Sequence, residues 1–224
     1  MLISLPEDVV HKVPLGNPET AVAEFAGLLT GIRPSAAADL EAMAHEAVDT
    51  ALRHGAVLMA VVHPADADPA LLTGVALAAP PTWDLDSAQT LRDAVEDVAG
   101  PDVRETLLVT TPLGPAVIAQ RVPGPEQARD GRPLTLQLQA FIPNPTTRRM
   151  LLLTLAGPSP TGWSTHQRLF GEIVTSANHD PADDFGPANP HPHPTTAPIP
   201  PRRRPTPTPA DDEESFETHT FRVT

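Results

Sequence analysis

Apolar residues recur at helical spacing in the first quarter of the chain. They lie three and four positions apart, which is the spacing of an amphipathic helix. We expect Ser35 to cap this helix and Gly55 to end it. The apolar residues are Leu40, Met43, Ala44, Ala47, Val48, Ala51 and Leu52. Before them, Asn17 provides a cap and Pro18 a first residue for another helix, which we expect to stop at Gly31. The pattern predicts two consecutive helices.

Short apolar runs bounded by turn residues follow. They cover residues 56–62, 71–78, 106–111, 115–122, 134–142 and 149–155. Such runs predict strands, and short turns between them predict antiparallel pairing. In the run 134–142 the residues alternate, which places leucines on one face and Gln137, Gln139 and Phe141 on the other. We expect the nearly all-apolar run 149–155 to be a central strand.

Two further helices are predicted. One begins at a capping box formed by Asp86 and Gln89 and ends at Gly100. The other starts at Ser159 and buries Trp163. Helices and short strands in this order predict an α+β fold, with an antiparallel sheet on which the helices pack.

The composition changes after residue 178. Residues 179–224 are rich in proline and show no apolar period. Such a segment buries too little apolar surface to offset its ordering entropy, so we expect a disordered, acidic-ended tail after an α+β domain of residues 1–178. The last ten residues contain Phe216 and Phe221. They predict either a docking peptide for a protein partner or a solvated end with incidental aromatic residues.

Charge and composition exclude several classes of function. The chain has 28 acidic and 15 basic residues, a net charge of −13 and no cysteine. The negative charge disfavours binding to nucleic acid, and the lack of thiols excludes disulfides and thiolate metal sites. No export signal begins the chain, and no apolar run reaches the roughly 20 residues of a membrane-spanning helix. We expect a cytoplasmic protein without membrane insertion.

The order of motifs in the second half of the chain resembles a known group. The motifs are TPLGPAV (Thr111–Val117), IPNP (Ile142–Pro145), MLLLTL (Met150–Leu155) and a helix with Trp163, Leu169–Phe170, Ile173–Val174 and Ser176. Over residues 105–178 the chain resembles actinobacterial proteins of unknown function with the Mog1/PsbP-like α/β/α fold. The resemblance implies an α/β/α sandwich. Members of this fold act mainly as binding or accessory modules, and the resemblance favours such a role here only by analogy of fold.

One group of residues could serve catalysis. On a helix, His45 and Asp49 share a face and could hold a divalent metal ion, with Glu46 as a base, in a metal-dependent hydrolase. The apolar residues of the same helix define its buried face, which places these three residues on the solvent side. The alternative is therefore a solvated charged face without a metal ion. No phosphate-binding loop or catalytic triad pattern occurs. We therefore expect no enzyme activity and no cofactor.

The candidate binding residues are polar or aromatic. Gln137, Gln139 and Phe141 lie on the predicted strand face, and Trp83 lies in a proline-framed loop, where it either anchors a partner or packs under a helix. The sequence thus predicts a non-catalytic protein-binding or accessory module with a recruiting tail. A chaperone-like accessory for secretion or assembly, which shields one dedicated partner, is the alternative.

Overall fold

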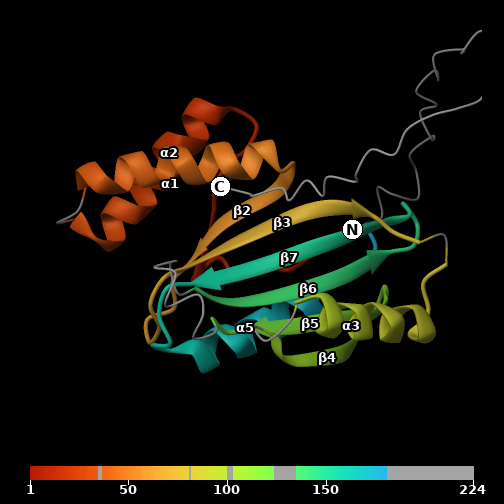
Figure 1. Ribbon diagram of the computed structural model, residues 1–224. Helices are drawn as coiled ribbons and strands as arrows, with labels where there is room; N and C mark the ends of the chain where they lie inside the picture. Colours follow the sequence, from red (N-terminus) through yellow and green to blue (C-terminus); the bar gives the residue numbers. More distant parts are fainter. Residues whose placement is uncertain (35–36, 81, 100–102, 124–134, 181–224) are drawn as a thin grey trace, which may run out of the picture. The chain divides into compact units, whose positions relative to one another are not determined.

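The computed structural model describes residues 1–34, 37–80, 82–99, 103–123 and 135–180. Within these ranges, seven strands form one antiparallel sheet in the order β1-β2-β3-β7-β6-β5-β4 (Figure 1). The strands are β1 (Val10–Lys12), β2 (Ala56–Val62), β3 (Ala70–Ala78), β4 (Val103–Thr111), β5 (Gly114–Arg121), β6 (Leu136–Asn144) and β7 (Arg149–Gly157). The α+β class is therefore confirmed, and β7, which was predicted to be a central strand, occupies the middle of the sheet.

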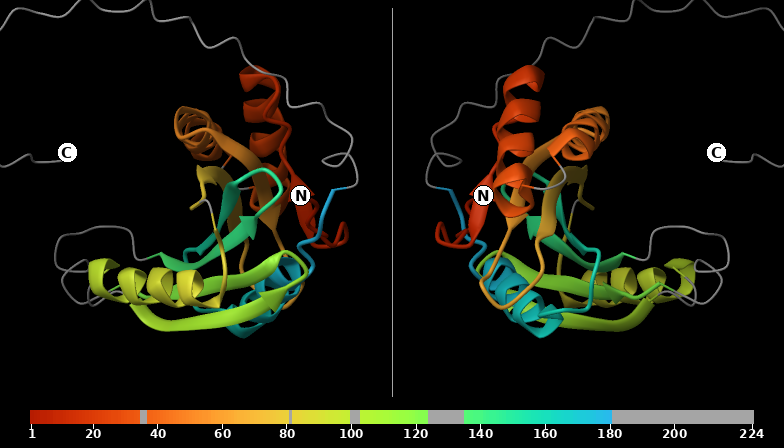
Figure 2. Two further views of the ribbon diagram at one scale, coloured as in Figure 1. Left: turned by 90° about the vertical axis from the view of Figure 1, so that its right-hand side faces the viewer. Right: turned by 90° about the vertical axis from the view of Figure 1, so that its left-hand side faces the viewer.

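Helices pack on both faces of this sheet. Those in the described part of the chain are α1 (Pro18–Ile32), α2 (Ala37–Arg53), α3 (Leu85–Ala99) and α5 (Trp163–Thr175). On one face lies α5, where Gln167 donates to Gln120 of β5 over 2.8 Å. On the other face, α1 and α2 lie at one end of the sheet and α3 at the other (Figure 2). None of these helices combines the length and apolar character needed to cross a membrane.

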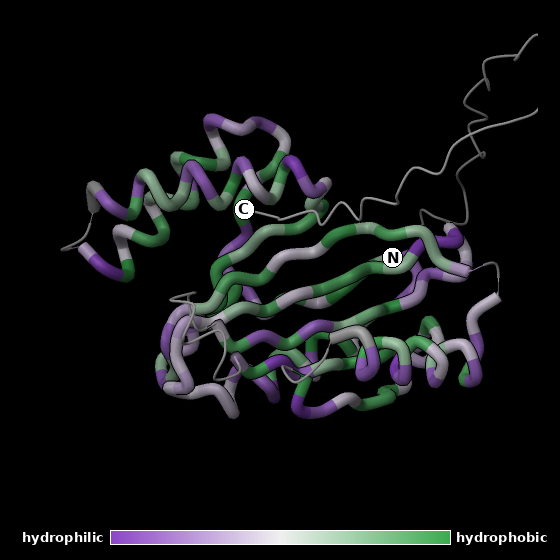
Figure 3. Tube along the Cα trace, viewed as in Figure 1, coloured by the Kyte–Doolittle hydropathy of each residue, from purple (hydrophilic) through white to green (hydrophobic). Residues whose placement is uncertain are grey.

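Alternate residues of the strands build two cores. The larger core lies under α5, where Leu72, Leu153 and Leu155 of the sheet meet Phe170 and Ile173 of the helix. A smaller core joins α1 and α2 to β2 on the opposite face. Its buried members are Val13, Ala21, Phe25, Ala44, Val48, Ala51, Met59 and Val61. In Figure 3 the strands β3 and β7 are mostly hydrophobic and the helices are mixed, as this layering requires.

The structure confirms some predicted helix ends and corrects others. The Asn17 side chain accepts the backbone N–H of Thr20 at 3.1 Å, and Gly55 has a φ of 69° after α2. The first helix continues through Gly31 to Ile32, since Gly31 does not adopt the left-handed conformation that would stop it.

The cap before α3 is Asp84 and not Asp86. Its carboxylate accepts the backbone N–H of Ser87 at 2.8 Å and the Ser87 hydroxyl at 2.7 Å. Ser35 lies outside the described residues. So does the predicted tail beyond Asp180, and its disorder remains a prediction.

Candidate docking surface on the open sheet face

Among the described residues, helices cover the face of the sheet that carries α1, α2 and α3 only at its two ends. At one end α1 and α2 pack on Met59 and Val61 of β2. At the other end α3 packs along β4 and β5, where the Thr106 hydroxyl donates to Glu96 of the helix. Between them, the strands β3, β7 and β6 lie in view with no described helix across them (Figure 1). We call this region the open sheet face.

Nine side chains make up the open sheet face. They are Leu71, Thr73 and Val75 on β3, Leu152, Thr154 and Ala156 on β7, and Gln137, Gln139 and Phe141 on β6. Each of the nine is half-buried and none is charged. Because residues paired across an antiparallel ladder point to the same side, the nine form one continuous surface.

The strand register arranges these side chains in three rows across the sheet. Val75, Leu152 and Phe141 form an apolar row. Thr73, Thr154 and Gln139 form a polar row beside it, and the Gln139 side chain accepts the Nε–H of Arg121 at 3.0 Å. Leu71, Ala156 and Gln137 form the third row. The surface therefore offers apolar contacts on both sides of a narrow band of hydrogen-bonding groups.

A groove runs along α2 beside this surface. It consists of two cavities, one of about 240 Å³ and one of about 470 Å³, and Met43, Ala47 and Leu71 line both. The smaller cavity is lined mainly by apolar residues of α1, α2 and the sheet and also by Arg33, and the larger one also touches Glu46. Met43 is 50% exposed, although it is a large apolar side chain at the edge of the groove.

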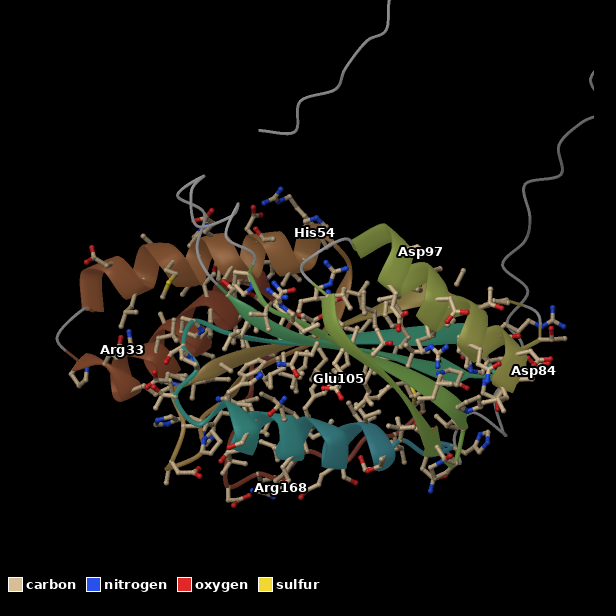
Figure 4. All side chains as sticks on the ribbon, turned by 60° about the horizontal axis from the view of Figure 1, so that its bottom comes forward. Arg33, His54, Asp84, Asp97, Glu105 and Arg168 are labelled. Carbon is tan, nitrogen blue, oxygen red and sulfur yellow. The ribbon has the colours of Figure 1, made fainter. Side chains whose placement is uncertain are left out.

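The helices that flank the open sheet face are acidic. Their carboxylates are Asp39, Glu41, Glu46 and Asp49 on α2, and Asp86, Asp93, Glu96 and Asp97 on α3. Arg53 pairs with Asp49 on its own helix at 2.9 Å, and Arg92 pairs with Asp93 at 2.9 Å. Figure 4 shows the side chains that the structure describes, with His54 labelled directly after α2 and Asp97 near the end of α3. Each helix carries four carboxylates and one arginine, so both flanking helices have a net negative charge.

The structure brings three of the predicted binding residues together. Gln137, Gln139 and Phe141 all belong to the open sheet face. Trp83 lies near the Pro143 end of β6, because a Cβ atom on Gly114 would contact both rings at 3.8 Å. Its indole N–H donates to the Pro115 carbonyl at 2.7 Å and its side chain is partly buried.

The other predicted residues lie elsewhere. Phe216 and Phe221 fall outside the described residues. His45, Glu46 and Asp49 are exposed on α2, and the Asp49 carboxylate is engaged by Arg53. Across the described ranges, no three His, Asp or Glu side chains are placed to hold a metal ion.

Sequence reasoning missed the contributions of β3 and β7 to this surface. Thr73 and Thr154 each interrupt an otherwise apolar run, and this is the only local signal that those strand faces differ from a buried core. No protein-family model matches this chain, and no curated protein matches it in sequence. The geometry of the open sheet face therefore carries the functional inference.

Proposed function

We propose that this protein is a non-catalytic binding module whose open sheet face is the docking surface for another protein. The observation that carries the proposal is the open sheet face of β3, β7 and β6, over which no described helix lies, with a groove beside it. An antiparallel sheet that faces water normally alternates apolar residues inside with polar residues outside. Here the outward side carries Leu71, Val75, Leu152 and Phe141, which favours a covering partner.

A cytoplasmic accessory role of the Mog1/PsbP-like α/β/α class is part of the same proposal. Helices on both sheet faces and the motif order of residues 105–178 support it. In this proposal the module works without a cofactor, and residues 179–224 recruit the partner protein. A chaperone-like accessory that shields one dedicated partner is the second candidate. The two cavities along α2 favour it, because a hollowed surface selects among partners more strongly than a flat face does.

Affinity purification from the native host tests the docking surface. The baits are the full chain and three variants of it. The variants are Thr154→Arg on the open sheet face, Met43→Arg at the edge of the groove and Ser164→Arg on the exposed side of α5. Ser164→Arg is the matched control, since it adds the same charge on the other sheet face. We expect a protein that the wild type and Ser164→Arg retain and the other two lose at least tenfold.

Thermal melting of all four proteins separates loss of docking from loss of fold. Met43 is half exposed, so Met43→Arg leaves the core intact. If Thr154→Arg is unstable, binding by Met43→Arg alone tests the docking surface. Recovery of the same proteins by all four baits would contradict the proposed docking surface, as would recovery of nothing specific.

A further inference from the structure

We infer that the docked segment of the partner is an amphipathic α-helix with basic residues along its edges. This inference rests on the proposed function and specifies the occupant of the open sheet face. It follows from three properties of that face, which are its backbone pairing, its width and the charge around it.

Backbone pairing excludes an added strand on the open sheet face. β3 is paired with β2 and β7, β7 with β3 and β6, and β6 with β7 and β5. The backbone N–H and C=O groups of these three strands are therefore used within the sheet. A segment that lies on them must satisfy its own backbone hydrogen bonds, which an α-helix does internally and an extended peptide does not.

The region that no described helix covers has the width of one helix. α2 packs over β2 and α3 packs over β5 and β4. Four strand intervals separate β2 from β5, which is about 19 Å at a strand spacing of about 4.8 Å. Packed helices lie about 8–10 Å apart, so two flanking helices at that separation leave space for one more between them.

The chemistry of the surface defines the inward side of such a helix. The apolar row Val75, Leu152 and Phe141 accepts apolar side chains. The cavity of about 240 Å³ beside Met43 and Leu71 accepts a larger one as an anchor. When a helix binds in a groove, apolar residues three or four positions apart on one of its faces make the contacts. A few buried anchor residues supply most of the binding energy.

Charge defines the edges of the helix. The open sheet face is uncharged. Glu46 lines the larger cavity and Arg33 lines the smaller one. Arg53 and Arg92 are paired with carboxylates of their own helices. Basic residues at the edges of a docked helix would lie beside two helices that each carry four carboxylates and one arginine. The same carboxylates disfavour a second copy of this acidic chain, which would present like charges.

A labelled model peptide tests this occupant on the full chain. The probe is an 18-residue peptide of leucine and lysine with leucines at helical spacing. One control peptide replaces every lysine with glutamate, and another scrambles the same composition so that no apolar face forms. Fluorescence anisotropy at low and at physiological salt measures binding of each peptide to the wild type and to Thr154→Arg, Met43→Arg and Ser164→Arg.

We expect the leucine–lysine peptide to bind the wild type and Ser164→Arg equally, and the other two variants at least tenfold more weakly. Both control peptides should bind the wild type at least tenfold more weakly, and salt should weaken the interaction. Absence of binding, equal binding of the scrambled peptide, or indifference to both Thr154→Arg and Met43→Arg would overturn the helix inference. If the host partner is still captured through the same residues, the docking surface stands and only its helical occupant is rejected.

Discussion

His166 shows how a single residue can be misjudged from sequence. Its position between Trp163 and Phe170 predicts a place at the edge of the core, but the residue is only 1% exposed. Its Nε2–H donates to the Asp68 carbonyl at 2.7 Å, because a carbonyl oxygen can only accept. This bond ties the loop before β3 to α5. The loop comes from a segment about 100 residues earlier, which no local pattern reveals.

The carboxyl of Asp84 should make the stability of the fold depend on pH. Hydrogen bonds from the backbone N–H and then the side chain of Ser87 lower the pKa of its carboxyl below the usual value. A carboxyl whose pKa is lowered in the folded state adds stability above its ordinary pKa and loses it as the pH falls through the lowered pKa. Asparagine keeps a capping oxygen but does not titrate. The stability advantage of the wild type over Asp84→Asn should therefore shrink as the pH falls.

Urea unfolding between pH 7 and pH 3 measures this difference. Asp86→Asn is the matched control, since among the described residues no hydrogen bond reaches the Asp86 carboxylate. A difference between wild type and Asp84→Asn that stays constant over the whole range would show that the charge of Asp84 does not contribute.

At the scale of the elements, α5 depends on the conformation of one glycine. The sequence predicts that this helix starts at Ser159, whereas it begins at Trp163 after Gly162, which has a φ of 68°. A Cβ atom on Gly162 would also overlap Ala67. The start of the helix is thus set by a left-handed residue and by contact with a distant loop.

Two glycine substitutions in α5 should have opposite effects. Gly162→Ala forces a left-handed alanine against Ala67, and we expect it to lower the free energy of unfolding by about 2 kcal/mol or more. Gly171→Ala lies inside the helix with open space at the Cβ position, and we expect it to raise that free energy by about 0.5–1 kcal/mol. Urea unfolding of both variants measures the effects. Equal destabilisation would mean that Gly162 is not required at the start of α5.

The strands were easier to predict than the ends of the helices. Short apolar runs between turn residues mark strands through side-chain composition alone, and β2 matches its predicted run at both ends. A helix end depends on which polar side chain reaches the free backbone N–H groups. Asp84 and Asp86 are equally plausible in sequence, and only the conformation of the chain before α3 selects Asp84.

At the scale of the whole molecule, the open sheet face results from non-sequential strand pairing. Alternation along β6 predicted the side of Gln137, Gln139 and Phe141, but the partners Thr73 and Thr154 come from distant segments. β3 pairs with β7 across more than 70 residues of chain, and this pairing creates the rows. Sequence patterns report which face of a strand is polar, and they do not report which strands become neighbours.

The most direct test of the docking surface is site-specific photocrosslinking in the native host. A photoreactive phenylalanine analogue replaces Thr154 on the open sheet face in one full-length protein and Ser164 on the exposed side of α5 in another. Our account predicts a discrete crosslinked protein from position 154 and none from position 164. Crosslinks of equal yield from both positions, or none from position 154, would contradict the claim that the open sheet face binds a protein partner.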